Sequence, residues 1–179
     1  MLRLFLVGFM ASGKTTLGRA LAEDLGISFI DTDNYLERRY RQTIPQLFAT
    51  RGEEAFRQLE RTILHEVADF EDVVIATGGG TPCHFDNMDY MNANGTTVHL
   101  LCSPDVILTR LRISRTPRPL VAGKTDDELR TYIADTLAAR DPFYTRAHYT
   151  FPSHQLEDRA QIAASVARFR HEILQLSEV

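Results

Sequence analysis

The segment Gly8-Phe9-Met10-Ala11-Ser12-Gly13-Lys14-Thr15 decides the fold of this chain. It matches the pattern G-x-x-x-x-G-K-[ST], in which glycines let the backbone curl so that its amide groups point at phosphate oxygens. An apolar run at residues 2–7 comes before it, and a helical pattern begins at Lys14. Because a helix N-terminus attracts anions, this strand, loop and helix predict a nucleotide phosphate site, with ATP or GTP as the ligand.

Two side chains of the loop add what its backbone cannot supply. The Lys14 ammonium can reach the β- and γ-phosphates, and the Thr15 hydroxyl can bind Mg²⁺. The alternative is a glycine turn beside a solvated lysine, which the flanking strand and helix disfavour. The residues expected to contact the nucleotide from this loop are Ala11, Ser12, Gly13, Lys14, Thr15 and Thr16.

Short apolar runs alternate with longer helical patterns along the rest of the chain. The expected strands are residues 2–7, 28–30, 73–76, 97–101 and 149–151, and the expected helices are residues 14–25, 35–41, 53–68, 85–92, 104–111, 126–140 and 159–176. This alternation predicts a three-layer α/β fold with a five-stranded parallel sheet covered by helices on both faces. Ligands of such sheets bind beyond the carboxyl ends of the strands.

Residues with strong positional preferences indicate where several helices begin and end. Thr125 or Asp126 is expected to cap one helix, and Pro104 after Ser103 suits the first turn of another. Gly26 and Gly95 are expected to end the helices that precede them.

Length and composition favour a single soluble domain, residues 1–179. The net charge of -4 argues against a nucleic-acid partner. Of the 20 basic residues, 18 are arginines, which suit anionic ligands, although codon bias is the preferred explanation for most of them. The two cysteines, Cys83 and Cys102, form no metal-binding or disulfide pattern, so we expect a reducing cytoplasm. The first apolar run is too short for a signal peptide or a membrane span.

Other classes of phosphate-loop protein lack support in this sequence. No guanine-reading N-K-x-D tetrapeptide occurs, which argues against a GTPase. The third expected strand ends in Thr77-Gly78-Gly79-Gly80, where motor and AAA-type ATPases carry an acidic pair. A small kinase with a second, phosphate-accepting ligand remains.

Polar residues after the second strand and on the next helix are candidates for that second ligand. Asp31 can hold a water on Mg²⁺, and Asp33 can reach an acceptor hydroxyl or merely cap the helix that begins near Asn34. Arg57 and Glu60 can pair along a helix, either at a functional site or as an ordinary exposed ion pair.

The ordered set of motifs G-x-M-x-S-G-K-T, D-T-D, F-x-x-x-G-E-x-x-F-R-x-x-E and T-G-G-G resembles the shikimate kinase family. Arg118-Pro119-Leu120 and Arg140-Asp141-Pro142-Phe143-Tyr144 continue the resemblance, which extends from Leu4 to about Tyr149. It implies transfer of the γ-phosphate of ATP, with Mg²⁺, to the 3-hydroxyl of shikimate in aromatic amino-acid biosynthesis.

The resemblance also implies a role for each matching residue. Lys14, Asp33 and Arg118 would be catalytic. Asp33 would contact the hydroxyls of shikimate, either orienting the 3-hydroxyl or also accepting its proton, and Arg118 would be the arginine of a lid that moves onto the phosphates. Arg57 and Arg140 would bind the shikimate carboxylate, Gly79 would let the ring approach the backbone, and Glu60 would hold Arg57.

Three further regions have expected roles, and two rival functions remain. Residues 33–61 are expected to bind the substrate, residues 112–124 to form the lid rather than a plain surface loop, and residues 152–156 to lie where relatives hold the base. We expect a monomer. The rivals are a kinase for gluconate or a nucleotide, and an inactive nucleotide-binding regulator.

Overall fold

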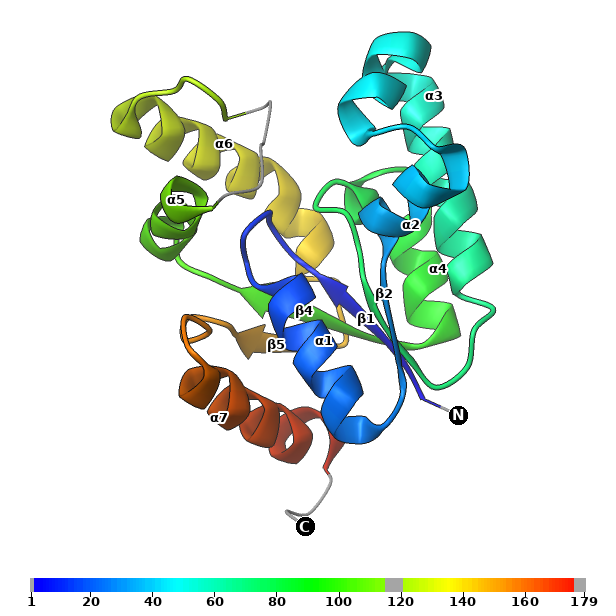
Figure 1. Cartoon of the computed structure of the whole chain (residues 1–179), viewed down its shortest axis with the longest axis vertical. Helices are drawn as coiled ribbons and strands as arrows, with labels where there is room; N and C mark the ends of the chain where they lie inside the picture. The colour runs from blue at the N-terminus through cyan, green and yellow to red at the C-terminus, as the bar shows by residue number, and fades with distance from the viewer. Residues whose placement is uncertain (1, 115–120, 176–179) are drawn as a thin grey trace.

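Five parallel strands form the central sheet of the computed structural model, which describes residues 2–114 and 121–175 (Figure 1). The strands are β1 (Arg3–Val7), β2 (Ser28–Asp31), β3 (Val73–Ala76), β4 (Thr96–Leu101) and β5 (Tyr149–Pro152). They lie in the order β2-β3-β1-β4-β5, and every neighbouring pair is parallel. The prediction of a five-stranded parallel sheet is therefore confirmed.

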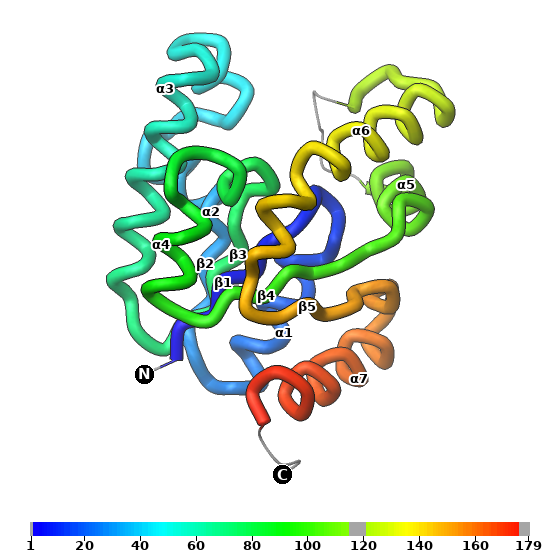
Figure 2. The backbone as a smooth tube through the Cα atoms, turned by 180° about the vertical axis from the view of Figure 1, so that it is seen from behind, coloured from blue at the N-terminus to red at the C-terminus, as the bar shows by residue number. Residues whose placement is uncertain are grey.

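Helices cover both faces of this sheet, as the alternating pattern predicts. Figure 1 shows α1 in front of the sheet, and Figure 2, the view from behind, shows α4 on the opposite face. The helices are α1 (Lys14–Leu25), α2 (Thr32–Tyr40), α3 (Ile44–Val67), α4 (Asn87–Asn94), α5 (Pro104–Ile113), α6 (Asp126–Tyr144) and α7 (Arg159–Phe169), with the short segments η1 (Thr81–Cys83) and η2 (Arg170–Leu174). Within the described ranges, no helix is both long and apolar enough to cross a membrane.

The side chains of β1 alternate between two hydrophobic clusters, because successive residues of a strand point to opposite faces. Phe5 and Val7 pack in the cluster formed with α2, α3 and α4, whereas Leu4 and Leu6 pack in the cluster formed with α1 and α7. All four are fully buried. Burial of each such side chain contributes about 2 kcal/mol, so the strand that leads into the phosphate loop is rigidly held.

Helix α3 begins earlier than predicted. Thr43 accepts a hydrogen bond from the amide of Gln46, whose side chain accepts one from the amide of Thr43, forming a capping box. Gly52 then interrupts the helix with φ 77° and ψ 171°. The prediction of a helix over residues 53–68 is confirmed for the segment after this kink, whereas the helical segment before it was not predicted.

The other boundaries differ in smaller ways. α2 begins at Thr32 rather than at residue 35, α6 continues to Tyr144 rather than ending at residue 140, and η1 was not predicted. Thr125 caps α6 and Pro104 is the first residue of α5, both as expected, and Ser103 caps α5. Gly26 ends α1 in the left-handed conformation, φ 66°, as expected.

Gly95 ends α4 for a different reason from Gly26, so alanine at the two positions should lower stability by different amounts. Its backbone is extended, but a Cβ atom there would lie 2.6 Å from the carbonyl oxygen of Arg3 and 2.9 Å from Cε2 of Phe5. We expect Gly95→Ala to lower the free energy of unfolding by about 3 kcal/mol. Gly26→Ala has open space around the new methyl group and should cost about 1 kcal/mol through backbone strain alone.

Urea unfolding of the two variants and the parent protein checks this difference. A loss for Gly95→Ala no larger than the loss for Gly26→Ala would contradict the close packing of β1 against the turn before β4.

Candidate active site

The strand register brings the predicted site segments to one edge of the sheet. Ala76 is in register with both Leu6 and Asp31, so the residues after β1, β2 and β3 emerge side by side. The phosphate loop, the D-T-D segment and the three glycines therefore meet at the carboxyl ends of the strands, as the sequence predicts.

The phosphate loop curls through three positive φ angles, at Gly8 (142°), Ala11 (61°) and Gly13 (98°). The buried Lys14 ammonium donates hydrogen bonds to the carbonyl oxygens of Gly8 and Phe9, each at 2.8 Å. These bonds draw the ammonium into the ring of the loop, directly at the N-terminus of α1. The loop thus has the shape and the positive charge of an anion cradle.

Thr15 and Asp31 form a pair of oxygen donors beside this cradle. The Thr15 hydroxyl donates to Oδ2 of Asp31 at 2.8 Å, and Oδ1 of Asp31 accepts from the amide of Asn34 to cap α2. The alternative that Asp33 caps this helix is therefore wrong. Mg²⁺ takes few protein ligands and keeps several waters, so a hydroxyl next to a carboxylate fits this ion.

Asp33 lies in the first turn of α2, close to the three successive glycines at residues 78–80, the glycine segment. The residue as a whole is exposed, yet protein atoms surround its carboxyl closely, and Oδ1 lies 2.8 Å from the position that a Cβ of Gly78 would take. Desolvation, reinforced by the negative charges of Asp31 and Glu60 and opposed by Lys14, raises the pKa of Asp33 to about 7. Such a carboxyl can gain or lose a proton near neutral pH, which suits an acid–base role.

Arg57 and Glu60 form a buried ion pair rather than the ordinary exposed pair. Nη1 of Arg57 lies 2.6 Å from Oε2 of Glu60, and the two side chains are only 14% and 6% exposed. The Thr81 hydroxyl donates to the other oxygen of Glu60 at 2.8 Å. The guanidinium also lies over the rings of Phe48 and Phe56. Glu60 therefore holds Arg57 in one orientation.

Arg57 keeps donors for a further partner. Its ion pairs use Nη1 and Nη2, the second with Glu53, while the buried Nε has no hydrogen-bond partner among the described residues. A guanidinium has five N–H donors and binds carboxylates in a two-point manner. A buried arginine in this state is suited to an anionic ligand.

Arg140 reaches the same glycine segment from α6. Its Nη1 lies 3.3 Å from the position of a Cβ at Gly79, and Nη1 of Arg57 lies 2.7 Å from that of a Cβ at Gly80. Burial raises the pKa of Cys83 to about 11, and the charges of Arg140 and Arg57 oppose that rise. Both guanidinium groups thus face the turn that contains the three glycines, where a side chain on the backbone would block approach.

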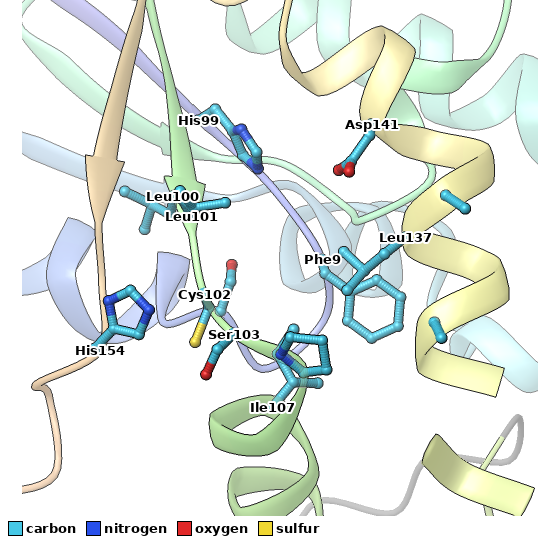
Figure 3. Close-up of a pocket in the computed structure, with 14 residues that line it drawn as sticks. Phe9, His99, Leu100, Leu101, Cys102, Ser103, Ile107, Leu137, Asp141 and His154 are labelled. Atoms are coloured by element: carbon cyan, nitrogen blue, oxygen red, sulfur yellow. The ribbon is translucent and has the colours of Figure 1, made fainter. Parts of the chain in front are cut away.

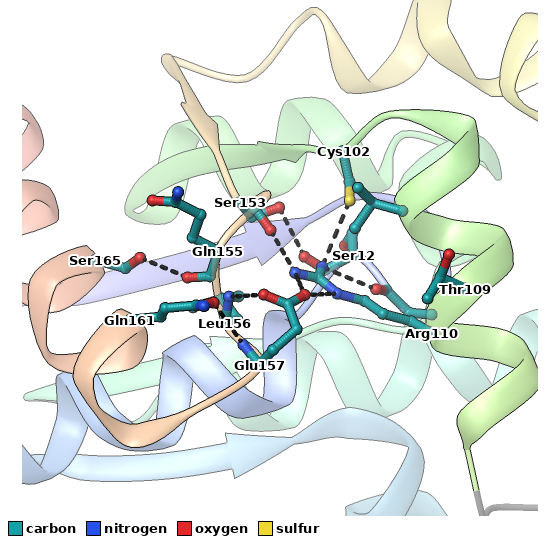
Figure 4. Close-up of polar contacts among 12 residues, drawn as sticks. Ser12, Cys102, Thr109, Arg110, Ser153, Gln155, Leu156, Glu157, Gln161 and Ser165 are labelled. Carbon is teal, nitrogen blue, oxygen red and sulfur yellow. Dashed lines mark hydrogen bonds and ion pairs between the residues drawn. The ribbon is translucent and has the colours of Figure 1, made fainter.

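Arg110 links the phosphate loop to the segment after β5, a role that no sequence pattern indicates (Figure 4). Its guanidinium donates to the carbonyl oxygens of Ala11 (3.3 Å) and Ser153 (2.8 Å) and pairs with Glu157 at 2.8 Å. The Ser153 hydroxyl donates to the carbonyl oxygen of Ser12 at 2.7 Å. The segment over residues 152–156 therefore lies against the phosphate loop, where the base of a nucleotide is expected.

A cavity of about 510 Å³ lies beside the phosphate loop, between β4, α5 and α6 (Figure 3). Phe9 and Ser12 line it from the loop, and Asp141 lines it from α6. Asp33, Arg57 and Gly79 are not among its lining residues, so the cavity adjoins the phosphate loop but not these three residues.

The predicted lid lies partly outside the described residues, and Arg118 is among those not described. α5 extends through Ile113, so the first two residues of the predicted 112–124 segment are helical. Arg112 donates to the Asp126 carboxylate at 2.7 Å and to the carbonyl oxygen of Lys124 at 2.9 Å. These bonds hold together the two ends of the segment.

A phosphate loop beside two arginines that face three glycines, at the edge of a 2-3-1-4-5 sheet, is the arrangement expected of a P-loop kinase of small molecules. A family model described as shikimate kinase matches residues 10–170. The chain therefore belongs to the shikimate kinase family.

Individual relatives agree with this assignment. A shikimate kinase of Bacteroides thetaiotaomicron is 54% identical over 176 residues, covering 98% of this chain and 100% of the relative. The crystal structure of shikimate kinase from that organism superposes with a TM-score of 0.95, covering 98% of this chain and 99% of the other. A structure of the Acinetobacter baumannii enzyme in complex with shikimate is 32% identical, with a TM-score of 0.85 and coverage of 99% and 96%.

Proposed function

We propose that this protein transfers the γ-phosphate of ATP to the 3-hydroxyl of shikimate, giving shikimate 3-phosphate and ADP in aromatic amino-acid biosynthesis. The observation that carries the proposal is the arrangement of Arg57 and Arg140 around the three glycines, next to Asp33 and the phosphate loop. Shikimate offers a carboxylate and three hydroxyl groups to this arrangement. Membership of the shikimate kinase family supports the same substrate.

In the proposed complex, the carboxylate of shikimate lies between the two guanidinium groups. The N–H groups of Arg57 and Arg140 that face the three glycines donate to it. Gly79 has no side chain, so the ring can approach the backbone. The substrate-binding region then consists of residues 33–61, the glycine segment and the end of α6.

Phosphoryl transfer in this site depends on alignment and charge stabilisation. Asp33 takes the proton of the 3-hydroxyl as that oxygen bonds to the γ-phosphorus, and the bond from the γ-phosphorus to the oxygen that bridges to the β-phosphorus breaks. ADP leaves with that oxygen. Lys14 stabilises the developing charge, and we propose that Arg118 joins it when the lid over residues 112–124 closes.

The nucleotide phosphates are proposed to lie in the loop cradle. Ala11, Ser12, Gly13, Thr15 and Thr16 would contact them, although the amide of Ser12 already donates to the carbonyl oxygen of Phe9 at 3.2 Å, which leaves its neighbours to supply most of the amide contacts. Thr15 would bind Mg²⁺ directly and Asp31 through a water. The ion, when bound, neutralises charge on the β- and γ-phosphates.

We also propose that the protein is a monomer in which one domain, residues 1–179, carries the whole site. Lys14, Asp33, Arg57 and Arg140 come from one chain, so the proposed chemistry needs no second copy. Sedimentation velocity of the purified protein at micromolar concentration should give a single species of about 20.3 kDa.

A coupled assay of ADP release with shikimate, gluconate and AMP as acceptors tests the function. We expect turnover with shikimate and none above the ATPase background with the other two, and phosphorus NMR should show one new phosphomonoester signal. Turnover only with gluconate or AMP would identify a different kinase. ATP binding without turnover on any acceptor would identify an inactive nucleotide-binding protein.

The raised pKa of Asp33 predicts the pH dependence of the reaction. Below a pH of about 7 this carboxyl is protonated and cannot take the hydroxyl proton. We therefore expect kcat/KM for shikimate to rise with pH through about 7 and to level off above it. Initial rates between pH 5.5 and 9 at constant ionic strength check this, and a profile that is flat from pH 6 to 8 would contradict a base of this pKa.

A further inference from the structure

Tyr144 connects the end of α6 to the glycine segment. Its hydroxyl donates a hydrogen bond of 2.5 Å to the carbonyl oxygen of Gly79. The side chain is fully buried and belongs to the hydrophobic cluster that contains Phe5 and Val7 of β1. Its ring also lies 5.1 Å from the ring of His99 on β4. The phenol is thus anchored in the core and reaches outward to a single backbone oxygen of the candidate site.

Tyr144 also lies beside one of the two arginines proposed to bind the carboxylate. Tyr144 and Arg140 are four residues apart on α6, so they share a helix face. Burial raises the pKa of Tyr144 well above its usual range, and Arg140 opposes this through its charge and a hydrogen bond. One side chain therefore contacts both Arg140 and the backbone at Gly79.

The hydrogen bond to Gly79 has a further geometric effect. The peptide unit is planar, so fixing the carbonyl of Gly79 also fixes the direction of the N–H of Gly80. Glycines tolerate many backbone conformations, and this segment contains three in succession. A tether from a rigid helix therefore restricts a segment that its own residues do not restrict.

We infer that Tyr144 is a positioning residue for shikimate, which fixes the spacing between the Gly79 backbone and the Arg140 guanidinium. This inference rests on the proposed function and extends it to a residue outside the contact set. Tyr144 acts on the shikimate side of the site and not on the phosphate loop. Loss of its hydroxyl should therefore weaken the binding of shikimate and leave that of ATP nearly unchanged.

The variant Tyr144→Phe tests the inference, since it keeps the buried ring and removes only the hydroxyl. We expect the KM for shikimate to rise about tenfold, the effect of losing one well-placed hydrogen bond, with kcat and the KM for ATP changed less than about threefold. The matched control is Tyr90→Phe, whose ring packs against the same core cluster and stacks on His65. It should leave all three constants unchanged.

A double-mutant cycle separates positioning from a general loss of structure. Tyr144→Phe combined with Arg140→Lys should raise the KM for shikimate less than the product of the single effects, because both changes disturb one unit. In the cycle with Arg57→Lys on α3, the coupling should be weaker, because Tyr144 lies beside Arg140 on α6. Equal changes in the KM values for ATP and shikimate, or multiplying effects in both cycles, would overturn the inference.

Hydrogen exchange of the glycine amides provides a second measurement that needs no activity. In Tyr144→Phe at 10 °C, the amides of Gly79 and Gly80 should exchange at least tenfold faster than in the parent, while those of β1 stay unchanged. Unchanged exchange at Gly79 and Gly80 would overturn the inference. If the parent protein fails to phosphorylate shikimate, the proposed function fails; if it succeeds and Tyr144→Phe matches it in every constant, only this inference fails.

Discussion

Asparagine in place of Asp33 is expected to lower kcat for shikimate phosphorylation about a thousandfold, within the range of effects for loss of a general base. The amide keeps the size of the carboxyl and can still orient a hydroxyl group, but it cannot take a proton at neutral pH. The KM for ATP should stay within about threefold, because Lys14 and the loop remain intact. Steady-state kinetics with either substrate varied would measure both effects.

The same substitution should also change how stability depends on pH. Unfolding curves that measure this change show at the same time whether the variant is folded. The folded-state pKa of Asp33 is raised from 3.8 to about 7, so between these values the native state binds more protons than the unfolded state. The ligand-free parent should therefore lose stability relative to Asp33→Asn as the pH rises from 4 to 7. A stable variant that retains more than a tenth of the parent kcat would show that Asp33 orients the hydroxyl without accepting its proton.

Removal of the Arg57 side chain is expected to have the largest effect on substrate binding. Arg57→Ala loses the fork proposed to bind the carboxylate and leaves the carboxylate of Glu60, 6% exposed, without its cation. Truncating one member of a buried charge pair typically costs about 2–5 kcal/mol. We expect the KM for shikimate to rise at least about 100-fold, while ATP affinity measured by calorimetry stays within a few fold.

Arg61→Ala provides the matched control for this variant. Arg61 lies one turn further along α3, is more exposed, and pairs with Asp86 at 2.8 Å rather than with Glu60. It should leave both substrate affinities within about twofold, as expected for a surface ion pair. An equal loss of ATP and shikimate binding in Arg57→Ala would show that Arg57 supports the fold rather than the substrate.

The features that the sequence predicts well are those determined over a few neighbouring residues. The phosphate loop requires glycines, a lysine and a hydroxyl at fixed spacing, so the pattern alone places Lys14 and Thr15 in it. The parallel sheet needs only the alternation of apolar and helical segments. The capping box of Thr43 and Gln46 is a local signal too, but the first part of α3, which it begins, was not predicted.

The features that the sequence does not reveal depend on contacts between distant segments. The pairing of Arg57 with Glu60 could be predicted, but its burial depends on neighbours that the fold brings in, among them Thr81, which lies 21 residues after Glu60. Arg110 is one arginine among 18 until the fold brings it to Glu157, 47 residues away. Tyr144 and Gly79 are separated by 65 residues. No local pattern encodes such pairings, because the sheet creates them.

Calorimetric titration of shikimate into the purified protein with ADP and Mg²⁺ present tests the central claim most directly. We predict a saturable heat with one shikimate bound per chain, abolished in Arg57→Ala and retained in Arg61→Ala. Absence of saturable heat with the parent protein, or equal heat with Arg57→Ala, would contradict a carboxylate site built on the buried pair of Arg57 and Glu60.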